Sequence, residues 1–354
     1  MQLGIIGLPM VGKTTIFQLL TKTNEKTSNQ AKANTAIAKI PDNRIDFLSK
    51  LYKPKKTTYA QLEIVDIPGL ISGTNKGAAV FLDSVRKADA LLQVVRAFDD
   101  EDVPAVTDEI NPIKDIDSIN YELLLADLDL VEKRIERINE NKKKNQMQKE
   151  LSLLEKLKET LSNETPLLSV ELDEEEKLIV DNYQFLTTKP MFWCLNIGED
   201  DLLSKDYPYS RDVLEYAKEK GIPIVELSAS IEKEIAELDE DEKNSFLEEL
   251  GIDESGVVKI ARGMYERLGL ISFFTVGDDE VKAWTVEKGT VAKKAAGKIH
   301  SDIERGFIRA EVVEYDDLYE WGSMNALKEK GLFRLEGKEY IVKDGDVIHF
   351  RFNV

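Results

Sequence analysis

A glycine-rich motif near the amino terminus constrains the fold of this chain more than any other feature. Residues 7–14 read GLPMVGKT and fit the pattern G-x-x-x-x-G-K-[ST]; they stand between an apolar run at residues 3–6 and a helix-compatible run at residues 15–20. In this position the backbone N–H groups of the loop turn toward phosphate groups, and the following helix adds the positive end of its dipole. The motif therefore predicts an α/β domain that opens with a phosphate-binding loop.

Two side chains of this motif have defined roles in phosphate-binding loops. Lys13 is expected to reach the β- and γ-phosphates of a nucleotide as a catalytic residue, and Thr14 to offer its hydroxyl group to Mg²⁺. A plain glycine turn with an exposed lysine is the simpler interpretation, but the flanking strand and helix favour the phosphate site. The nucleotide-binding residues predicted in this region are Met10, Val11, Gly12, Lys13, Thr14 and Thr15.

A second motif follows the next predicted strand. Residues 66–70 read DIPGL and match the D-x-x-G element of P-loop switch proteins. In that element Asp66 would hold Mg²⁺ through a water molecule, and the N–H group of Gly69, the second predicted catalytic residue, would contact the γ-phosphate. Ras-like and Gα enzymes carry a glutamine next, which orients the attacking water, whereas Leu70 has no donor or acceptor. Either another group positions the water, or hydrolysis is slow.

The predicted base-binding residues depart from the GTPase pattern. GTPases carry N-K-x-D after the fourth strand, and this chain reads NIGE from Asn196 onward, with Ile197 in place of the lysine and Glu199 in place of the aspartate. That aspartate accepts hydrogen bonds from guanine N1–H and N2–H₂, so its replacement disfavours strict specificity for GTP. In a simpler interpretation Asn196 only caps a loop. Ser228 and Ala229 resemble the S-A-K loop that lies beside the base.

Short apolar runs alternate with helical segments and predict a mostly parallel sheet. The predicted strands cover residues 3–6, 62–65, 91–95, 191–195 and 222–225. Between the third and fourth strands, apolar residues recur at helical spacing over residues 124–138 and 147–161, which predicts an inserted antiparallel helical hairpin. From residue 271, alternating strands and one helix at residues 291–299 predict a smaller α+β module.

Charge is distributed unevenly along the chain. The 354 residues carry a formal net charge of −19, which argues against a surface that binds nucleic acid throughout and against a DNA-binding role. Residues 131–161 nevertheless hold nine Lys and Arg residues against six Glu residues, while residues 232–254 hold eleven acidic residues and two lysines. The tip of the hairpin, Lys142, Lys143 and Lys144, is either a solvated turn or a contact for an RNA backbone. The sequence predicts an acidic body with a basic arm.

The remaining composition predicts a cytoplasmic protein. No run approaches the ~18 apolar residues of a membrane span, and the amino terminus lacks a signal-peptide pattern. Cys194 is the single cysteine and is interpreted as a small buried hydrophobic residue within a strand. His300 and His349 both belong to the C-terminal module, so a histidine base or metal centre at the nucleotide is not expected.

Taken together, the motifs resemble the Obg-like ATPase family, called YchF in bacteria. The resemblance includes the P-loop, DIPGL, the N-x-x-E ending, the helical insert, and two C-terminal segments at residues 296–311 (AGKIHSDIERGFIRAE) and 344–354 (DGDVIHFRFNV). It implies a Ras-like G domain, an inserted helical (coiled-coil) domain and a ubiquitin-like (β-grasp) TGS domain. The implied boundaries are 1–118 and 186–270 for the G domain, 119–185 for the helical domain and 271–354 for the TGS domain.

The resemblance also implies a molecular switch that binds ATP in preference to GTP, uses Mg²⁺, hydrolyses ATP slowly to ADP and phosphate, and associates with the ribosome or its large subunit. Two positions depart from the family. Met10 replaces a common asparagine, and Gln30 stands where a threonine is usually available to Mg²⁺, so this ligand stays unassigned. Two alternatives remain open: an Obg-type GTPase, and a ribosome- or RNA-binding factor whose contact is independent of nucleotide.

Overall fold

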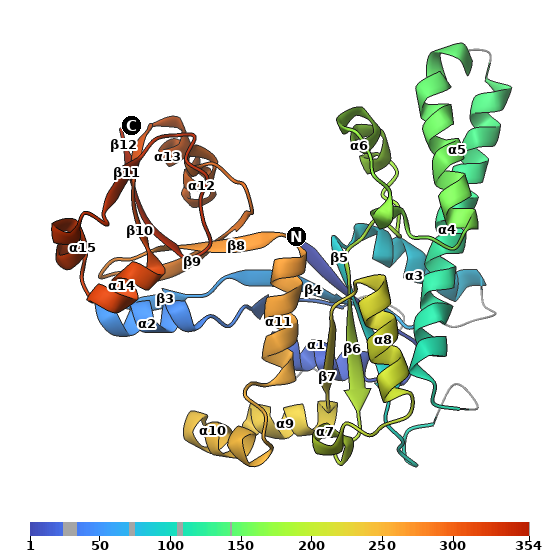
Figure 1. The fold of residues 1–354 in the computed structure, drawn as a ribbon, viewed down its shortest axis with the longest axis horizontal. Helices are drawn as coiled ribbons and strands as arrows, with labels where there is room; N and C mark the ends of the chain where they lie inside the picture. Colours follow the sequence, from blue (N-terminus) through green and yellow to red (C-terminus); the bar gives the residue numbers. More distant parts are fainter. Residues whose placement is uncertain (24–33, 71–74, 105–108, 142–143, 354) are drawn as a thin grey trace. The chain divides into compact units, whose positions relative to one another are not determined.

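The chain folds into two compact units, each with its own sheet (Figure 1). The structure is a computed structural model and describes residues 1–23, 34–70, 75–104, 109–141 and 144–353. The first unit consists of Met1–Ala36 and Glu63–Ile260, and the second of Ile37–Leu62 and Ala261–Val354. None of the helices within the described ranges combines the length and the apolar character that a membrane crossing requires.

A six-stranded sheet with the order β2-β4-β1-β5-β6-β7 runs through the first unit. Strand β1 pairs in parallel with β4 and β5, and β6 pairs in parallel with β5 and β7, which confirms the predicted parallel arrangement. The strands are Gln2–Ile6 (β1), Asn34–Lys39 (β2), Gln61–Asp66 (β4), Ala90–Ala97 (β5), Met191–Ile197 (β6) and Ile224–Leu227 (β7). Because parallel strands run in the same direction, their carboxyl ends meet at one edge of the sheet, where α/β proteins bind ligands.

Helices pack against this sheet through two hydrophobic clusters. Phe81 and Val85 of α3 join α4, β1 and β4 in one cluster. In the other, Ile116 of α4 and Val213 of α8 pack with Trp193 of β6, and Cys194 beside it is fully buried, as predicted. The helices of this unit outside the hairpin are Lys13–Thr21 (α1), Asn75–Lys87 (α3), Asp201–Ser204 (α7), Ser210–Lys220 (α8), Ala229–Glu237 (α9) and Glu240–Glu249 (α10). Helix Gly256–Arg267 (α11) begins in this unit and ends in the second.

The predicted helical hairpin is confirmed as an insertion between β5 and β6, and it adds no strand to the sheet. Its first helix is longer than predicted. It begins at Pro112, where the side chain of Asn111 accepts a hydrogen bond from the N–H group of Lys114 at 3.1 Å. The hairpin elements are Pro112–Glu140 (α4), Lys144–Met147 (η1), Gln148–Ser162 (α5), Leu167–Ser169 (η2) and Glu174–Asp181 (α6).

A buried carboxylate fixes the base of the hairpin. Asp127 of α4 is completely buried and accepts hydrogen bonds from the N–H groups of Leu186 and Thr187, at 2.9 and 2.8 Å, and from the Thr187 hydroxyl group at 2.8 Å. Burial raises the pKa of this carboxyl, and the hydrogen bonds act in the opposite direction. These bonds tie the chain that returns from the hairpin to the helix that enters it.

The second unit contains the β-grasp module. Its sheet has the order β11-β10-β12-β8-β9-β3, with β8 and β12 parallel at the centre and antiparallel partners on either side of that pair. Helix α12 packs three alanines against the sheet beside Phe273 and Phe350. The elements are Leu270–Thr275 (β8), Glu280–Glu287 (β9), Ala292–Ile299 (α12), Ser301–Arg305 (α13), Phe307–Glu314 (β10), Tyr315–Trp321 (α14), Met324–Lys330 (α15), Arg334–Glu336 (β11) and Asp346–Phe352 (β12).

An N-terminal segment completes the second unit, and the sequence patterns did not predict this. Strand β3 (Lys56–Thr58) pairs in parallel with β9 at the edge of the sheet. Helix α2 (Asn43–Tyr52) carries Arg44, whose guanidinium lies 2.7 Å from the carboxylate of Asp344. Residues 37–62 therefore pack with the C-terminal module although they directly precede Asp66 in the sequence.

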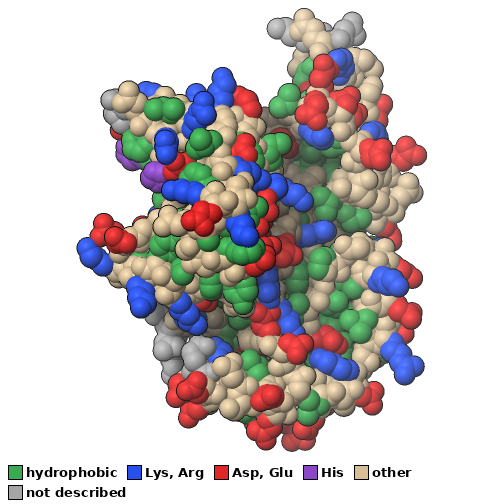
Figure 2. All heavy atoms as spheres, turned by 60° about the vertical axis from the view of Figure 1, so that its left-hand side comes forward, with side chains coloured by type: hydrophobic (Ala, Val, Ile, Leu, Met, Phe, Trp, Pro, Cys, Tyr) green, Lys and Arg blue, Asp and Glu red, His purple; other side chains and the backbone are tan. Residues whose placement is uncertain are grey.

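The acidic segment at residues 232–254 lies on the surface. It forms most of α9 and all of α10, and most of its carboxylates are exposed. Acidic side chains gather along the lower edge of the molecule in Figure 2, at the level where α10 lies in Figure 1. Much of the negative charge is thus concentrated on one part of the first unit.

Candidate nucleotide-binding site

The glycine-rich loop connects β1 to α1, as predicted, and ends at the amino terminus of the helix. Gly12 precedes the helix with a φ of 98°, and a Cβ atom at this position would lie 2.6 Å from the side-chain nitrogen of Asn196. Only glycine avoids both the left-handed strain and this close approach. Met10 also has a positive φ of 63°, and its side chain is half exposed. The ammonium group of Lys13 donates a hydrogen bond to the carbonyl oxygen of Leu8 at 2.6 Å.

The two predicted magnesium-binding side chains lie next to each other. The hydroxyl group of Thr14, in the first turn of α1, donates a hydrogen bond to a carboxylate oxygen of Asp66 at the end of β4, at 2.9 Å. The two residues are 52 positions apart in the sequence. The order of the strands brings them together, because β1 and β4 are neighbours.

Burial disfavours the charged forms of Lys13 and Asp66 when no ligand is bound. Only 8% of Lys13 and 8% of Asp66 is exposed. Burial lowers the pKa of Lys13 to about 8, and the nearby charge of Asp66 acts in the opposite direction. Burial likewise raises the pKa of Asp66, which the Thr14 hydroxyl group and the Lys13 charge oppose. A bound polyphosphate would favour the charged form of Lys13, and a bound cation would favour the charged form of Asp66.

The DIPGL element places its last two residues in different surroundings. Gly69 lies against the phosphate-binding loop, since a Cβ atom on it would lie 2.9 Å from the Lys13 ammonium nitrogen and 3.1 Å from the nitrogen of Pro9. Leu70 is 2% exposed and packs in a cluster with Phe81 and Val85. The Leu70 side chain is therefore part of the hydrophobic core.

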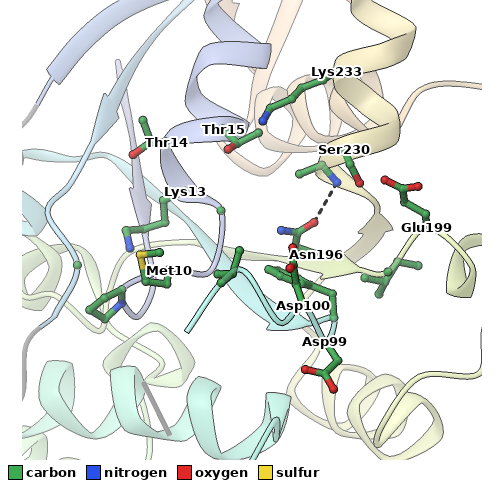
Figure 3. A pocket seen from close by; sticks show the side chains of 18 of the residues that line it. Met10, Lys13, Thr14, Thr15, Asp99, Asp100, Asn196, Glu199, Ser230 and Lys233 are labelled. Carbon is green, nitrogen blue, oxygen red and sulfur yellow. Dashed lines mark hydrogen bonds between the residues drawn. The ribbon is translucent and has the colours of Figure 1, made fainter. Parts of the chain in front are cut away.

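Asn196 joins three parts of the site. It lies in β6, and its amide nitrogen donates to the carbonyl oxygen of Val11 at 3.1 Å, while its amide oxygen accepts from the N–H group of Ala229 at 3.0 Å. Figure 3 shows Asn196 between the glycine-rich loop and the start of α9. Both polar atoms of its amide are used in this way, so Asn196 fixes the loops around the cavity.

A cavity of about 970 Å³ connects these residues. In Figure 3, Lys13 and Met10 lie at one end and Glu199 at the other. Val11 and Ser228 do not line the cavity: both are buried, and the Ser228 hydroxyl group shares a hydrogen bond with that of Ser230 at 2.9 Å. The predicted residues that line it are Met10, Gly12, Lys13, Thr14, Thr15, Asp66, Gly69, Asn196, Ile197, Glu199 and Ala229.

Several lining residues were not predicted. Those in the loop after β5 and in α9 are Phe98, Asp99, Asp100, Val103, Ser230 and Lys233. The signal that could have found them is their position, because all of them follow the carboxyl ends of predicted strands, the edge at which open α/β sheets bind ligands.

Other predictions fall elsewhere. Gln30, Lys142 and Lys143 lie outside the described residues, and Lys144 begins the short helix η1 at the hairpin tip. Neither His300 nor His349 lines the cavity.

The donor set suits Mg²⁺. A hydroxyl and a carboxylate oxygen 2.9 Å apart, close to a lysine that would reach phosphate, are hard oxygen ligands of the type that Mg²⁺ takes together with water and phosphate oxygens. Thr14 and Asp66 are the residues that would hold the ion.

The fold and the site define the class of protein. A sheet with five neighbouring parallel strands, a glycine-rich loop at the start of a helix, and an aspartate beside the threonine of that loop are the features of a P-loop nucleotide-binding protein of the GTPase type. A family model described as "50S ribosome-binding GTPase" matches residues 2–145. A second, named YchF-GTPase_C and described as a protein of unknown function, matches residues 270–353.

Full-length relatives identify the family. The ribosome-binding ATPase YchF of Bacillus subtilis (strain 168) is 45% identical over 361 residues, and that of Escherichia coli O157:H7 is 41% identical over 360 residues; in both cases the match covers 99% of each chain. The solved structure of the Schizosaccharomyces pombe YchF GTPase superposes with a TM-score of 0.88 at 33% identity and covers 99% of this chain and 97% of its own. This chain belongs to the YchF family.

Proposed function

We propose that this chain is a ribosome-associated, Mg²⁺-dependent ATPase that acts as a slow nucleotide switch. The observation that carries the proposal is the convergence of Lys13, Thr14 and Asp66 at one end of a single cavity. The curated relatives, which match over their full length, are named ribosome-binding ATPases. The cytoplasm is the compartment in which such a protein would work.

The chemistry is hydrolysis of the γ-phosphate by water. Lys13 supplies positive charge to the β- and γ-phosphates, and the Gly69 N–H group donates to a γ-phosphate oxygen. Thr14 and, through water, Asp66 would hold Mg²⁺, which would neutralise negative charge on the phosphates. Leu70 has no polar atom in its side chain and is buried, so it does not orient the attacking water. The resulting hydrolysis is slow, as a switch with long-lived bound states requires.

The rate of ATP hydrolysis tests the proposed enzymatic activity. We expect phosphate release from ATP to fall at least a hundredfold in Lys13→Ala, because one donor to the transition-state charge typically contributes that much. Lys50→Ala, which removes an exposed lysine in the second unit, is the matched control and should hydrolyse ATP at the wild-type rate. Equal rates for wild type and Lys13→Ala would contradict the proposal.

The base preference rests on Glu199. This exposed carboxylate lines the cavity at the end opposite Lys13, in a motif that lacks the lysine and the aspartate of N-K-x-D. The chain therefore lacks the aspartate that selects guanine in a GTPase, and we expect ATP to bind more tightly than GTP. Calorimetry with both nucleotides measures this. GTP binding at least tenfold tighter than ATP would favour the Obg-type GTPase instead.

Sedimentation with ribosomal subunits tests whether the bound nucleotide controls ribosome association. If nucleotide controls the contact, the amount of protein that sediments with ribosomal subunits will differ between ATP, ADP and no nucleotide. Identical sedimentation in all three states would favour a binding factor whose contact is independent of nucleotide.

We further propose that the basic hairpin tip contacts ribosomal RNA. The hairpin sequence has a local positive charge in an otherwise acidic chain, which would confine phosphate contacts to a small region. Reversal of Lys142, Lys143 and Lys144 to Glu should weaken sedimentation with ribosomes and its salt dependence, with ATP affinity unchanged. The matched control, in which Lys205, Lys218 and Lys220 are reversed, changes the net charge equally and should sediment like wild type. Equal sedimentation of the tip variant would assign those lysines to a solvated turn.

A further inference from the structure

A buried arginine stands beside the nucleotide cavity without lining it. Arg96 lies near the end of β5, is 5% exposed, and is the register partner of Asn196 on β6. A buried cation is costly unless polar groups surround it, so its partners reveal what it holds in place.

The partners of Arg96 are the two ends of one turn. Its Nε donates to the carbonyl oxygen of Phe98 at 3.1 Å, and its two terminal nitrogens donate to the carbonyl oxygens of Val103 at 3.0 Å and Pro104 at 3.3 Å. The guanidinium carbon also lies 4.5 Å from the centre of the Phe98 ring. One planar group therefore closes residues 98–104 into a loop, which is a geometry that the fork of an arginine provides and a lysine does not.

This loop forms a wall of the cavity. Phe98, Asp99, Asp100 and Val103 all line it, and residues 98–104 belong to neither a helix nor a strand. Within the loop, the N–H group of Val103 donates to the carbonyl oxygen of Asp100 at 3.2 Å, and that of Asp102 donates to the Asp100 carboxylate at 2.9 Å. These bonds shape the tip of the turn, and Arg96 joins its two ends.

The wall faces the part of a nucleotide that the phosphate loop does not hold. In Figure 3, Asp99 and Asp100 lie apart from Lys13 and Thr14, and the strand that leads to them pairs Arg96 with Asn196. Carboxylates next to a polyphosphate would repel it, whereas next to a sugar or base they can accept hydrogen bonds.

The same arginine also faces the first turn of α4. Burial raises the pKa of the Asp115 carboxyl to about 6, and the nearby positive charge of Arg96 acts in the opposite direction. Arg96 thus has a carboxylate near its charge as well as three carbonyl oxygens, which accounts for its stable burial.

We propose that Arg96 is a positioning residue for the nucleoside: by joining the ends of the loop at residues 98–104, it holds the cavity wall against the sugar and base of the bound nucleotide. This inference rests on the proposed nucleotide site. It does not involve the phosphate end, so Arg96 should affect binding of a nucleotide and leave binding of a bare polyphosphate unchanged.

The test compares ATP with inorganic tripolyphosphate, both with Mg²⁺, in calorimetric titrations of the full chain. Arg96→Lys keeps the charge but cannot span both ends of the loop, and Arg96→Met removes the charge as well. We expect both to bind ATP at least tenfold more weakly and tripolyphosphate within twofold of wild type. In hydrolysis assays Arg96→Lys should raise KM at least tenfold with kcat within twofold of wild type.

Asp127→Asn is the matched control, because it changes another buried charged group that, like Arg96, does not line the cavity, and it lies on helix α4, away from the loop at residues 98–104 in the sequence. It should bind ATP like wild type. The inference is overturned if both Arg96 variants bind ATP within twofold of wild type, if ATP and tripolyphosphate affinities fall together, or if Asp127→Asn loses ATP affinity equally. Wild-type binding of GTP but not ATP would refute the proposed base preference alone, and the Arg96 comparison would then be made with GTP in the same way.

Discussion

Introducing a glutamine at Leu70 should destabilise the protein without accelerating hydrolysis. The substitution restores the residue with which Ras-like enzymes orient the attacking water. In this structure, however, Leu70 is 2% exposed and packs in the cluster that contains Phe81, Val85 and Ile119. A glutamine that keeps this position has its amide group in a hydrocarbon environment, directed away from the γ-phosphate.

The expected loss of stability has two components. Full burial of a leucine side chain contributes roughly 1.5–3 kcal/mol, which Leu70→Gln forfeits. An amide buried without hydrogen-bond partners costs about 1–3 kcal/mol more. Since the two side chains have similar volumes, no large cavity is added. The free energy of unfolding should therefore fall by about 2.5–6 kcal/mol, the sum of these ranges.

Two measurements are needed. Urea denaturation followed by circular dichroism gives the loss of stability, and a single-turnover assay with saturating Mg²⁺ and ATP gives the hydrolysis rate. Leu125→Gln is the matched control, because Leu125 lies on α4 with 59% of its surface exposed and the same change there should cost less than about 0.5 kcal/mol. If Leu70→Gln were as stable as wild type, or hydrolysed ATP tenfold faster, the argument that core packing fixes the direction of this side chain would be wrong.

Two further predictions follow from buried charges. Because the pKa of Lys13 is lowered to about 8 in the free protein, and phosphate binding requires its ammonium form, the Kd for Mg²⁺-ATP should rise about tenfold between pH 7 and pH 9, or about 1.4 kcal/mol. Calorimetry over this range checks the effect, and Lys13→Met, which cannot titrate, should show a flat profile; a flat wild-type profile would contradict the lowered pKa. Asp127→Ala should reduce the free energy of unfolding by about 3–5 kcal/mol, because it leaves the buried N–H groups of Leu186 and Thr187 without their acceptor. Urea denaturation measures this loss, which should be smaller for Asp127→Asn; a loss under about 1 kcal/mol would show that the base of the hairpin does not depend on these bonds.

The sequence alone determined the elements whose signals are local. The glycine-rich loop, the DIPGL turn and the hairpin heptads each depend on residues within a few positions of one another, and each has the predicted structure. One strand begins later than predicted: the predicted strand starts at Ile222, whereas β7 starts at Ile224. Pro223 lies immediately before it and has no N–H group to donate to a neighbouring strand, so the strand starts after it.

Another difference is the start of α4. The hairpin periodicity predicts a helix from residue 124, but the helix begins at Pro112, after the capping side chain of Asn111. That Asn-Pro pair is a local start signal, and it was available in the sequence. The first residues of α4 do not share the periodicity of the hairpin, because they pack against the sheet of the first unit, where the apolar pattern follows the shape of the core.

The remaining features of the site depend on tertiary contacts, most of them between segments that lie far apart in the sequence. Asn196 bridges Val11 and Ala229, Leu70 is turned into the core, and Arg96 joins the ends of a loop. Strand β3 is three polar residues whose partner, β9, lies more than two hundred positions later in the chain. A sequence pattern specifies periodicity and turn chemistry over short distances. Which strands become neighbours, and which polar atom meets which carbonyl, depends on packing between segments that no local pattern connects.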